Sequence, residues 1–452
     1  MKSRNVDMLS GSITKALLSM AVPIMIMNVM QCLFNIMDMT VLKIFADDMS
    51  VGAVGACGTL TSLCINLLIG ISVGANVIVA RRIGEGNRSR ADKAVTTSML
   101  LAVTGGVALM IFGVIFAETL LKWTNCPESL LEGAAKYFKL YFYSVPMLMI
   151  YNFSASILRA IGDTKRPMYF LILGGFVKAL CTLFFVAVLG MDVEGVGIAT
   201  VISTAVLFVS GFVALIKSRD VVSIQFKELK FDIKELKDIL FVGVPAGLQS
   251  SLYALANVVI TTAVNSFGAD ATTGISIANQ FDGILYQISY APSLAATPFV
   301  AQNIGAGNIK RVKKTMGSAM FITVAFGATF GMLSAVFSEQ LSALMSASPS
   351  VIAFSKQKMI IISSTYFICG INDVMSGVLR GMGKPIIPTV STLVYMCLFR
   401  FLWVYAIFPL YPNLTFLYTV WPVGWILSII TLLMFYFPAI SKLQRKSLNA
   451  GV

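Results

Sequence analysis

The stretch "ARRIGEGNRSRADKA" at residues 80–94 returns as "AQNIGAGNIKRVKKT" at residues 301–315. Seven of the fifteen aligned positions are identical at an offset of 221 residues. The same offset aligns "LRAIG" at 158–162 with "LRGMG" at 379–383. Phrases that recur in the same order over this distance predict a chain made of two similar halves.

The composition indicates a membrane protein. Hydrophobic residues make up 57% of the 452 residues and charged residues only 12%, which is more apolar side chain than a soluble core of this size buries. The apolar blocks have the length that a helix needs to cross a bilayer, and they lack the alternation of barrel strands. We therefore expect an all-α integral membrane protein with twelve transmembrane helices. The predicted spans are 15–42, 51–80, 94–117, 136–160, 167–190, 195–217, 237–266, 272–301, 314–338, 356–381, 386–408 and 415–440.

Each half of the chain contains six of these spans. Because six is even, both halves start on the same side of the membrane, which predicts two pseudo-symmetric six-helix bundles related by an axis along the membrane normal. The predicted domains are an N-terminal lobe at 1–217, a cytosolic linker at 218–236, a C-terminal lobe at 237–440 and a cytosolic tail at 441–452. The repeated phrase itself is interpreted as a turn in which Gly84 and Gly86 end a helix.

The net charge of +13 reflects orientation in the membrane. Twenty-six of the 34 Lys and Arg residues fall in the termini and in alternate loops on one side. Only six fall in the opposite loops or at helix mouths, where we place Lys356 and Lys358. This bias predicts that both termini are cytosolic. We expect no nucleic-acid partner.

Several phrases together resemble one transporter family. They are "FNIMDMTVL" at 34–42, "GISVGANVIVARRIGEGN" at 70–87, "LRAIGDTKRP" at 158–167, and the counterparts "VAQNIGAGN" at 300–308 and "LRGMGKP" at 379–385. They resemble the multidrug and toxic compound extrusion (MATE) family of the MOP flippase superfamily, over nearly the whole chain. The resemblance implies two bundles facing a central cavity, and export of small organic, often cationic, compounds by alternating access in exchange for protons or sodium.

Ionisable side chains inside a bilayer are costly and mark candidate functional sites. Five stand out in the predicted spans, away from the span ends, namely Asp38, Lys178, Asp282, Asp373 and Arg400. The chain has no histidine, so a proton relay near neutral pH requires carboxylates.

The first span carries the strongest candidate. Gln31, Asn35 and Asp38 share one helix face, because they are spaced by four and three residues. Asp38 matches the first-helix aspartate of the family, where the resemblance implies a role in cation coupling. We expect Lys178 to pair with Asp38, and Arg400 to do the same beside Asp373 or Asp282. The alternative is that each cation snorkels to the membrane surface or neutralises a structural carboxylate.

The second half repeats this polar pattern. Gln249, Tyr253 and Asn257 are spaced by four residues, and Tyr253 stands where the sodium-coupled branch of the family has a glutamate. The predicted cation-coupling residues are Asp38, Asn35, Asp282 and Asp373. The predicted residues of the substrate cavity are Gln31, Asn152, Lys178, Gln249, Tyr253, Asn257, Asn279, Tyr286 and Arg400.

The sequence predicts a transporter and not an enzyme, because histidine, a metal-ligand cluster and a nucleotide-binding loop are all missing from its pattern. We expect no cofactor other than the coupling ion. A proton is favoured, and sodium at Asp38 or Asp373 stays open. The expected partners are small-molecule substrates and the lipid bilayer, for a monomer in the plasma membrane of a bacterium. The alternative function is a flippase for a lipid or lipid-linked precursor in the same superfamily.

Overall fold

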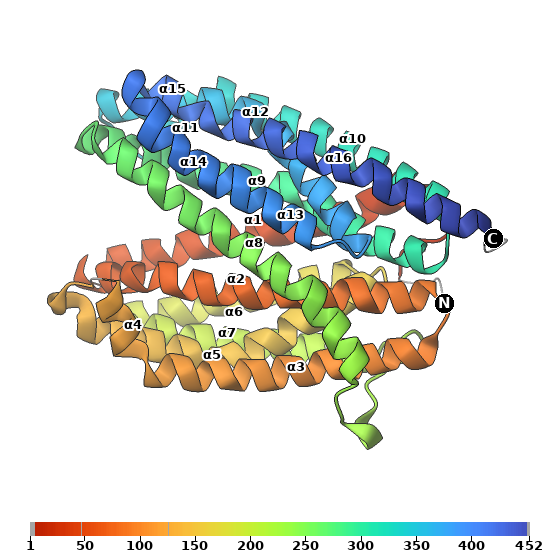
Figure 1. The fold of residues 1–452 in the computed structure, drawn as a ribbon. Helices are drawn as coiled ribbons and strands as arrows, with labels where there is room; N and C mark the ends of the chain where they lie inside the picture. Colours follow the sequence, from red (N-terminus) through yellow and green to blue (C-terminus); the bar gives the residue numbers. More distant parts are fainter. Residues whose placement is uncertain (1–4, 47, 125, 450–452) are drawn as a thin grey trace. The chain divides into compact units, whose positions relative to one another are not determined.

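The computed structural model describes residues 5–46, 48–124 and 126–449, and within these ranges it contains helices and no β-strand (Figure 1). The helices of the first half are α1 (Ile13–Phe45), α2 (Asp48–Gly84), α3 (Arg88–Ile115), α4 (Ala117–Trp123), α5 (Glu128–Ala160), α6 (Lys165–Thr182), the π-helix η1 (Leu183–Val188) and α7 (Val193–Ile216). A 3-10 turn, η2 (Phe226–Glu228), lies in the linker. The expected helical fold class is therefore confirmed.

The second half follows the same order. It contains α8 (Ile233–Asn265), α9 (Ala269–Gly305), α10 (Ile309–Val336), α11 (Ser338–Ala343), α12 (Pro349–Gly381), α13 (Ile386–Thr392), η3 (Leu393–Leu398), α14 (Phe399–Leu402), η4 (Trp403–Ile407), η5 (Phe408–Leu410), α15 (Leu414–Tyr418) and α16 (Val420–Asn449). The bounds of α2, α3 and α5 recur in α9, α10 and α12 at the offset of 221 residues. The repeat seen in short phrases thus extends to whole helices.

Twelve long helical segments in the described residues correspond to the twelve predicted spans. Nine of the described segments are both long and apolar enough to cross a membrane by length and composition. The other three are α5, α8 and α9, which are 33, 33 and 37 residues long. Length is sufficient for a span in all three.

The helices pack into two compact units, each with one central helix. In the first unit, which is mainly Val29–Val244, α5 packs against α2, α3 and α7. In the second unit α12 packs against α9, α10 and α16. Because α5 and α12 are repeat partners, the two units are built on one plan.

The units exchange the amino-terminal parts of two helices. Val6–Asn28 packs with the second unit, whereas α8 up to Val244 packs with the first unit. Each of the helices α1 and α8 therefore contributes to both units. The domain division at residues 217 and 237, which follows the repeat, stays a prediction about sequence halves.

The repeated phrase forms the same turn in both halves. Gly86 and Gly307 have φ values of +68° and +71°, which glycine adopts without the steric cost of a side chain. Asn87 and Asn308 then cap the next helix by accepting the amide hydrogens of Arg90 and Arg311 at 3.0 and 3.2 Å. The turn predicted at Gly86 is confirmed.

Candidate functional site

The first unit contains a buried ion pair between α1 and α6. The ammonium of Lys178 contacts Oδ2 of Asp38, and the hydroxyl of Thr182 donates to Oδ1 at 3.4 Å. The Asp38 and Lys178 side chains are only 9% and 18% exposed. The ion pair expected from the sequence is present, and its role in coupling stays a prediction.

Helix geometry explains why these groups meet. Lys178 and Thr182 are four residues apart on α6 and η1 follows directly, so both present their donors to the same carboxylate. A Cβ at Gly175 would collide with the ring of Phe34, so the missing side chain lets α6 approach α1 closely. A small residue one turn before Lys178 thereby helps to bring it to Asp38.

The remaining candidates of the first unit differ in exposure. Gln31 and Asn35 are exposed on the same face of α1 as Asp38. Asn152 on α5 is half-buried and donates to the carbonyl of Leu148 in its own helix at 3.0 Å. The polar stripe of α1 is therefore accessible at two positions and ends at the buried ion pair.

The second unit contains a different buried ion pair, between α9 and α12. Lys358 Nζ lies 2.8 Å from Oδ2 of Asp282, and the same ammonium contacts the side-chain oxygen of Asn279. Lys358 is 2% exposed. Its placement at a helix mouth is wrong, because α12 begins at Pro349, ahead of the predicted start at residue 356. Pro349 after Ser348 is a helix-start signal that would have located Lys358 well inside the helix.

Arg400 binds a neutral partner. Its Nη1 donates to Oδ1 of Asn257 on α8 at 2.8 Å, and its guanidinium lies 5.2 Å from the ring centre of Trp421. Within the described ranges no ion pair joins Arg400 to Asp373 or Asp282. The expected pairing of Arg400 is therefore wrong, because Lys358 occupies the position beside Asp282.

Asp373 is buried at a helix contact. It is 2% exposed, its Oδ2 has no hydrogen-bond partner among the described residues, and its backbone carbonyl accepts the hydroxyl of Ser293 at 2.6 Å. The preceding Asn372 donates to the Tyr253 hydroxyl at 3.2 Å and accepts from Ser428 at 2.6 Å. Asp373 thus sits in a polar layer of the second unit, apart from the Asp282 pair.

The polar face of α8 contacts several elements. Gln249 donates to Thr392 of α13 at 3.0 Å, Tyr253 meets Asn372 of α12, and Asn257 meets Arg400 of α14. Tyr286 of α9 stacks on Tyr290 with ring centres 5.4 Å apart. The side chains predicted from the spacing of α8 are therefore engaged within the second unit.

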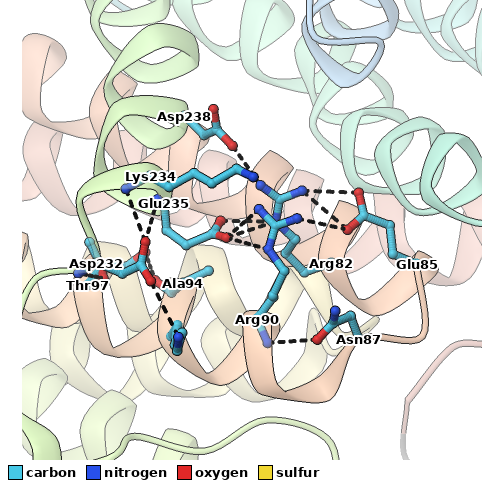
Figure 2. Close-up of polar contacts among 12 residues, drawn as sticks. Arg82, Glu85, Asn87, Arg90, Ala94, Thr97, Asp232, Lys234, Glu235 and Asp238 are labelled. Carbon is cyan, nitrogen blue, oxygen red and sulfur yellow. Dashed lines mark hydrogen bonds and ion pairs between the residues drawn. The ribbon is translucent and has the colours of Figure 1, made fainter.

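Sequence reasoning missed an ion-pair cluster built on the first copy of the repeated phrase (Figure 2). Arg82 and Arg90 both donate to the carboxylate of Glu235 at the start of α8, at 3.0 and 2.7 Å. Arg82 also pairs with Glu85 at 3.1 Å and with Asp238 at 2.6 Å. The phrase therefore anchors the start of α8.

The second copy of the phrase anchors the chain that leads into α1. Arg311 donates to the carbonyls of Met8, Ser10 and Gly11 at 2.9 to 3.1 Å, and Asn303 donates to that of Met8 at 3.0 Å. The first copy thus binds the first turns of α8, and the second copy binds the segment just before α1. Through these contacts Val6–Asn28 packs with the second unit, and the start of α8 packs with the first unit.

These features define a class of protein. Two repeated helical bundles with membrane-spanning helices, and buried charges inside each bundle, are characteristic of secondary transporters. The model of the MatE family matches residues 23–184 and 245–406, one match in each half. The chain belongs to the MatE family of multi-pass membrane transporters.

Curated relatives align over most of the chain. "Probable multidrug resistance protein YoeA" of Bacillus subtilis (strain 168) is 27% identical over 391 residues, which covers 84% of each protein. The "FAD transporter" of Shewanella oneidensis is 25% identical over 403 residues, which covers 87% of each. The chain is thus similar to bacterial proteins named for more than one kind of cargo.

Solved structures share the fold. One described as the outward-facing conformation of a multidrug resistance MATE family transporter of the MOP superfamily has a TM-score of 0.89 at 21% identity, and the match covers 98% of this chain and 100% of that chain. A MOP superfamily transporter from Pyrococcus furiosus, described as having a binding pocket of reverse polarity, has a TM-score of 0.91 at 22% identity, with 98% and 99% covered. The two-bundle fold with twelve helices is therefore shared with these transporters.

Proposed function

We propose that the protein is a secondary active antiporter that exports small organic compounds in exchange for protons or sodium, and that it catalyses no reaction. The observation that carries the proposal is the Asp38–Lys178 pair, on the same face of α1 as the exposed polar residues Gln31 and Asn35. Family membership and the names of the curated relatives support export of organic cargo.

The pair offers a mechanism for coupling. A proton that binds Asp38 removes the charge that Lys178 balances, and a buried ammonium without its counter-ion is strongly destabilised. Lys178 then has to reach water or another partner, which changes how α6 packs on α1. Release of the proton restores the pair. Proton binding and helix rearrangement are linked in this scheme, as antiport by alternating access requires.

A proton is the favoured coupling ion. An ammonium already occupies one side of Asp38, which disfavours a sodium ion there, since two cations would share one carboxylate. Asp373 remains the alternative sodium site, because its Oδ2 is free of described partners. We further propose a plasma-membrane protein that acts as a monomer, with both termini in the cytosol on the basis of the basic loops.

A second candidate function is a flippase for a lipid or lipid-linked precursor. The buried cations Lys358 and Arg400 favour it, because such lipids carry phosphate groups. The two functions make different predictions for the cargo, which is a water-soluble compound in one case and a lipid in the other.

The test is transport by the purified protein in liposomes. Ethidium movement is followed with a proton gradient or a sodium gradient imposed alone, for the native chain, Asp38→Asn and the control Asp220→Asn. Asp220 is an exposed linker carboxylate. We expect the proton gradient to drive ethidium transport, Asp38→Asn to abolish it and Asp220→Asn to retain it. Gradient-driven transport by Asp38→Asn at the native rate would overturn the coupling role. Movement of a fluorescent lipid with no ethidium transport would favour the flippase.

A further inference from the structure

Arg400 is a buried cation that lacks a matching anion. It is 2% exposed. Among the residues that the structure describes, its Nε has no hydrogen-bond partner, and its Nη1 donates to the amide oxygen of Asn257. Its Nη2 lies 3.9 Å from the sulfur of Met396, a weak acceptor. No carboxylate lies within ion-pair distance of Arg400 in the ranges that the structure describes.

The other two intramembrane cations are matched. Lys178 contacts Asp38, and Lys358 lies 2.8 Å from Asp282. Arg400 therefore differs from both, although it is nearly the repeat counterpart of Lys178. Burial of an unmatched guanidinium is strongly unfavourable, and one neutral amide compensates only part of the lost hydration.

Two cations converge on one aromatic ring. The Arg400 guanidinium lies 5.2 Å and the Lys358 ammonium 5.8 Å from the ring centre of Trp421. The ring is partly exposed, and Asn257 is exposed on α8. The amide that Arg400 contacts is therefore itself at the surface of this unit.

This set of groups suits a planar organic anion. A guanidinium presents parallel N–H donors that match the two oxygens of a carboxylate or phosphate. Trp421 offers a face for an aromatic group beside the charge. Lys358 adds a second positive charge, while Asp282 balances only one of the two cations.

We propose that Arg400, with Lys358 and Trp421, forms a site in the second unit that binds the carboxylate or phosphate of an aromatic compound. Asn257 occupies the guanidinium in the absence of this anion and releases it when the anion binds. The proposal rests on the proposed transport function, because it assigns anionic aromatic compounds to the cargo.

The test is binding to the purified full-length chain in an uncharged detergent, which requires no transport. Phenyl phosphate and benzoate are titrated, with tetraphenylphosphonium as the cationic probe, and binding is followed by tryptophan fluorescence and calorimetry. The lipid source is tested separately, by repeating the phenyl phosphate titration in nanodiscs of phosphatidylglycerol and of phosphatidylcholine. If phosphatidylglycerol weakens phenyl phosphate binding and phosphatidylcholine does not, the bound anion is a lipid headgroup.

Three variants give the expected pattern. Arg400→Gln weakens phenyl phosphate binding by about thirtyfold or more, since the anion loses a buried charged hydrogen-bond partner. Asn257→Ala keeps or strengthens binding, because it removes the competing acceptor. Lys230→Gln, at a linker position whose side chain is 77% exposed, leaves the affinity unchanged. Arg400→Lys, which keeps the charge without the fork, binds more weakly than the native chain and serves if Arg400→Gln does not fold.

The proposed site is refuted if Arg400→Gln or Arg400→Lys binds phenyl phosphate as tightly as the native chain does. It is also refuted if the native chain binds neither phenyl phosphate nor benzoate. The proposed function is judged separately. A native chain that transports ethidium but binds no anion retains the function and loses this site. A chain that binds anions through Arg400 without gradient-driven transport retains the site and loses the function.

Discussion

Replacement of Glu235 by Gln tests the cluster at the first repeated phrase. The Glu235 side chain is 2% exposed and receives hydrogen bonds from Arg82 at 3.0 Å and Arg90 at 2.7 Å. Removal of one partner from a buried ion pair costs about 3 to 5 kcal/mol. Arg82 keeps Glu85 and Asp238 as partners, and Arg90 is 29% exposed and reaches water. The expected loss is therefore below that range, at about 2 to 3 kcal/mol.

The assay is thermal unfolding of the detergent-solubilised protein, with the double variant Arg90→Gln, Glu235→Gln completing a cycle. The coupling energy between the two residues is expected to be about 0.5 to 3 kcal/mol. The exposed pair of Lys230 and Glu228 serves as the control, and Glu228→Gln should cost less than about 1 kcal/mol. An unchanged unfolding temperature for Glu235→Gln, or a coupling energy of zero, would refute the anchoring of α8 by this cluster.

Other predictions concern the α1–α6 pair, a helix cap and the repeated turn. Lys178→Gln should alter the pH dependence of transport, measured in liposomes, because Asp38 loses its cation; an unchanged profile and rate would contradict the coupling scheme. Asp232→Asn should destabilise the fold at neutral pH, because backbone amides of the first turn of α8 lower the pKa of Asp232 from its ordinary value of 3.8. Because the pKa of Asp232 is lower in the folded state, the ionised carboxylate stabilises the fold at pH values above the ordinary pKa, and this stabilisation is lost as pH falls through the folded-state pKa. The unfolding temperatures of the native chain and of Asp232→Asn, measured against pH, should therefore converge in acid. A constant difference at all pH values would exclude a charge effect. Gly86→Ala should lower stability by about 1 kcal/mol or more, because Gly86 has a positive φ. Gly105→Ala, in a helix with open space around it, should raise stability. Thermal unfolding measures both variants, and a change of the same sign in the two would contradict the backbone argument.

The sequence located Asp38 and Lys178 and paired them correctly, because both stand out as charges in apolar spans and the repeat sets their helices in one half. It failed for Lys358 and Arg400. The predicted helix start at residue 356 put Lys358 at a helix mouth, whereas α12 begins at Pro349. Arg400 was expected beside Asp373 or Asp282, and Lys358 pairs with Asp282. The burial of Glu235 is not predictable from the sequence, because no local pattern distinguishes a buried carboxylate from the exposed ones of a charged linker.

The sequence by itself determined the helical membrane fold, the twelve segments, the two related halves and the turn at Gly86. These properties depend on local hydrophobicity and on backbone preferences, which neighbouring residues express without tertiary contacts. Only the tertiary structure decided which charges meet and which segments cross between units. Arg400 and Asn257 are 143 residues apart, and Arg82 and Glu235 are 153 residues apart. Such partners are set by the packing of helices and by the close approach that small residues allow, and neither is encoded in the spacing of one helix.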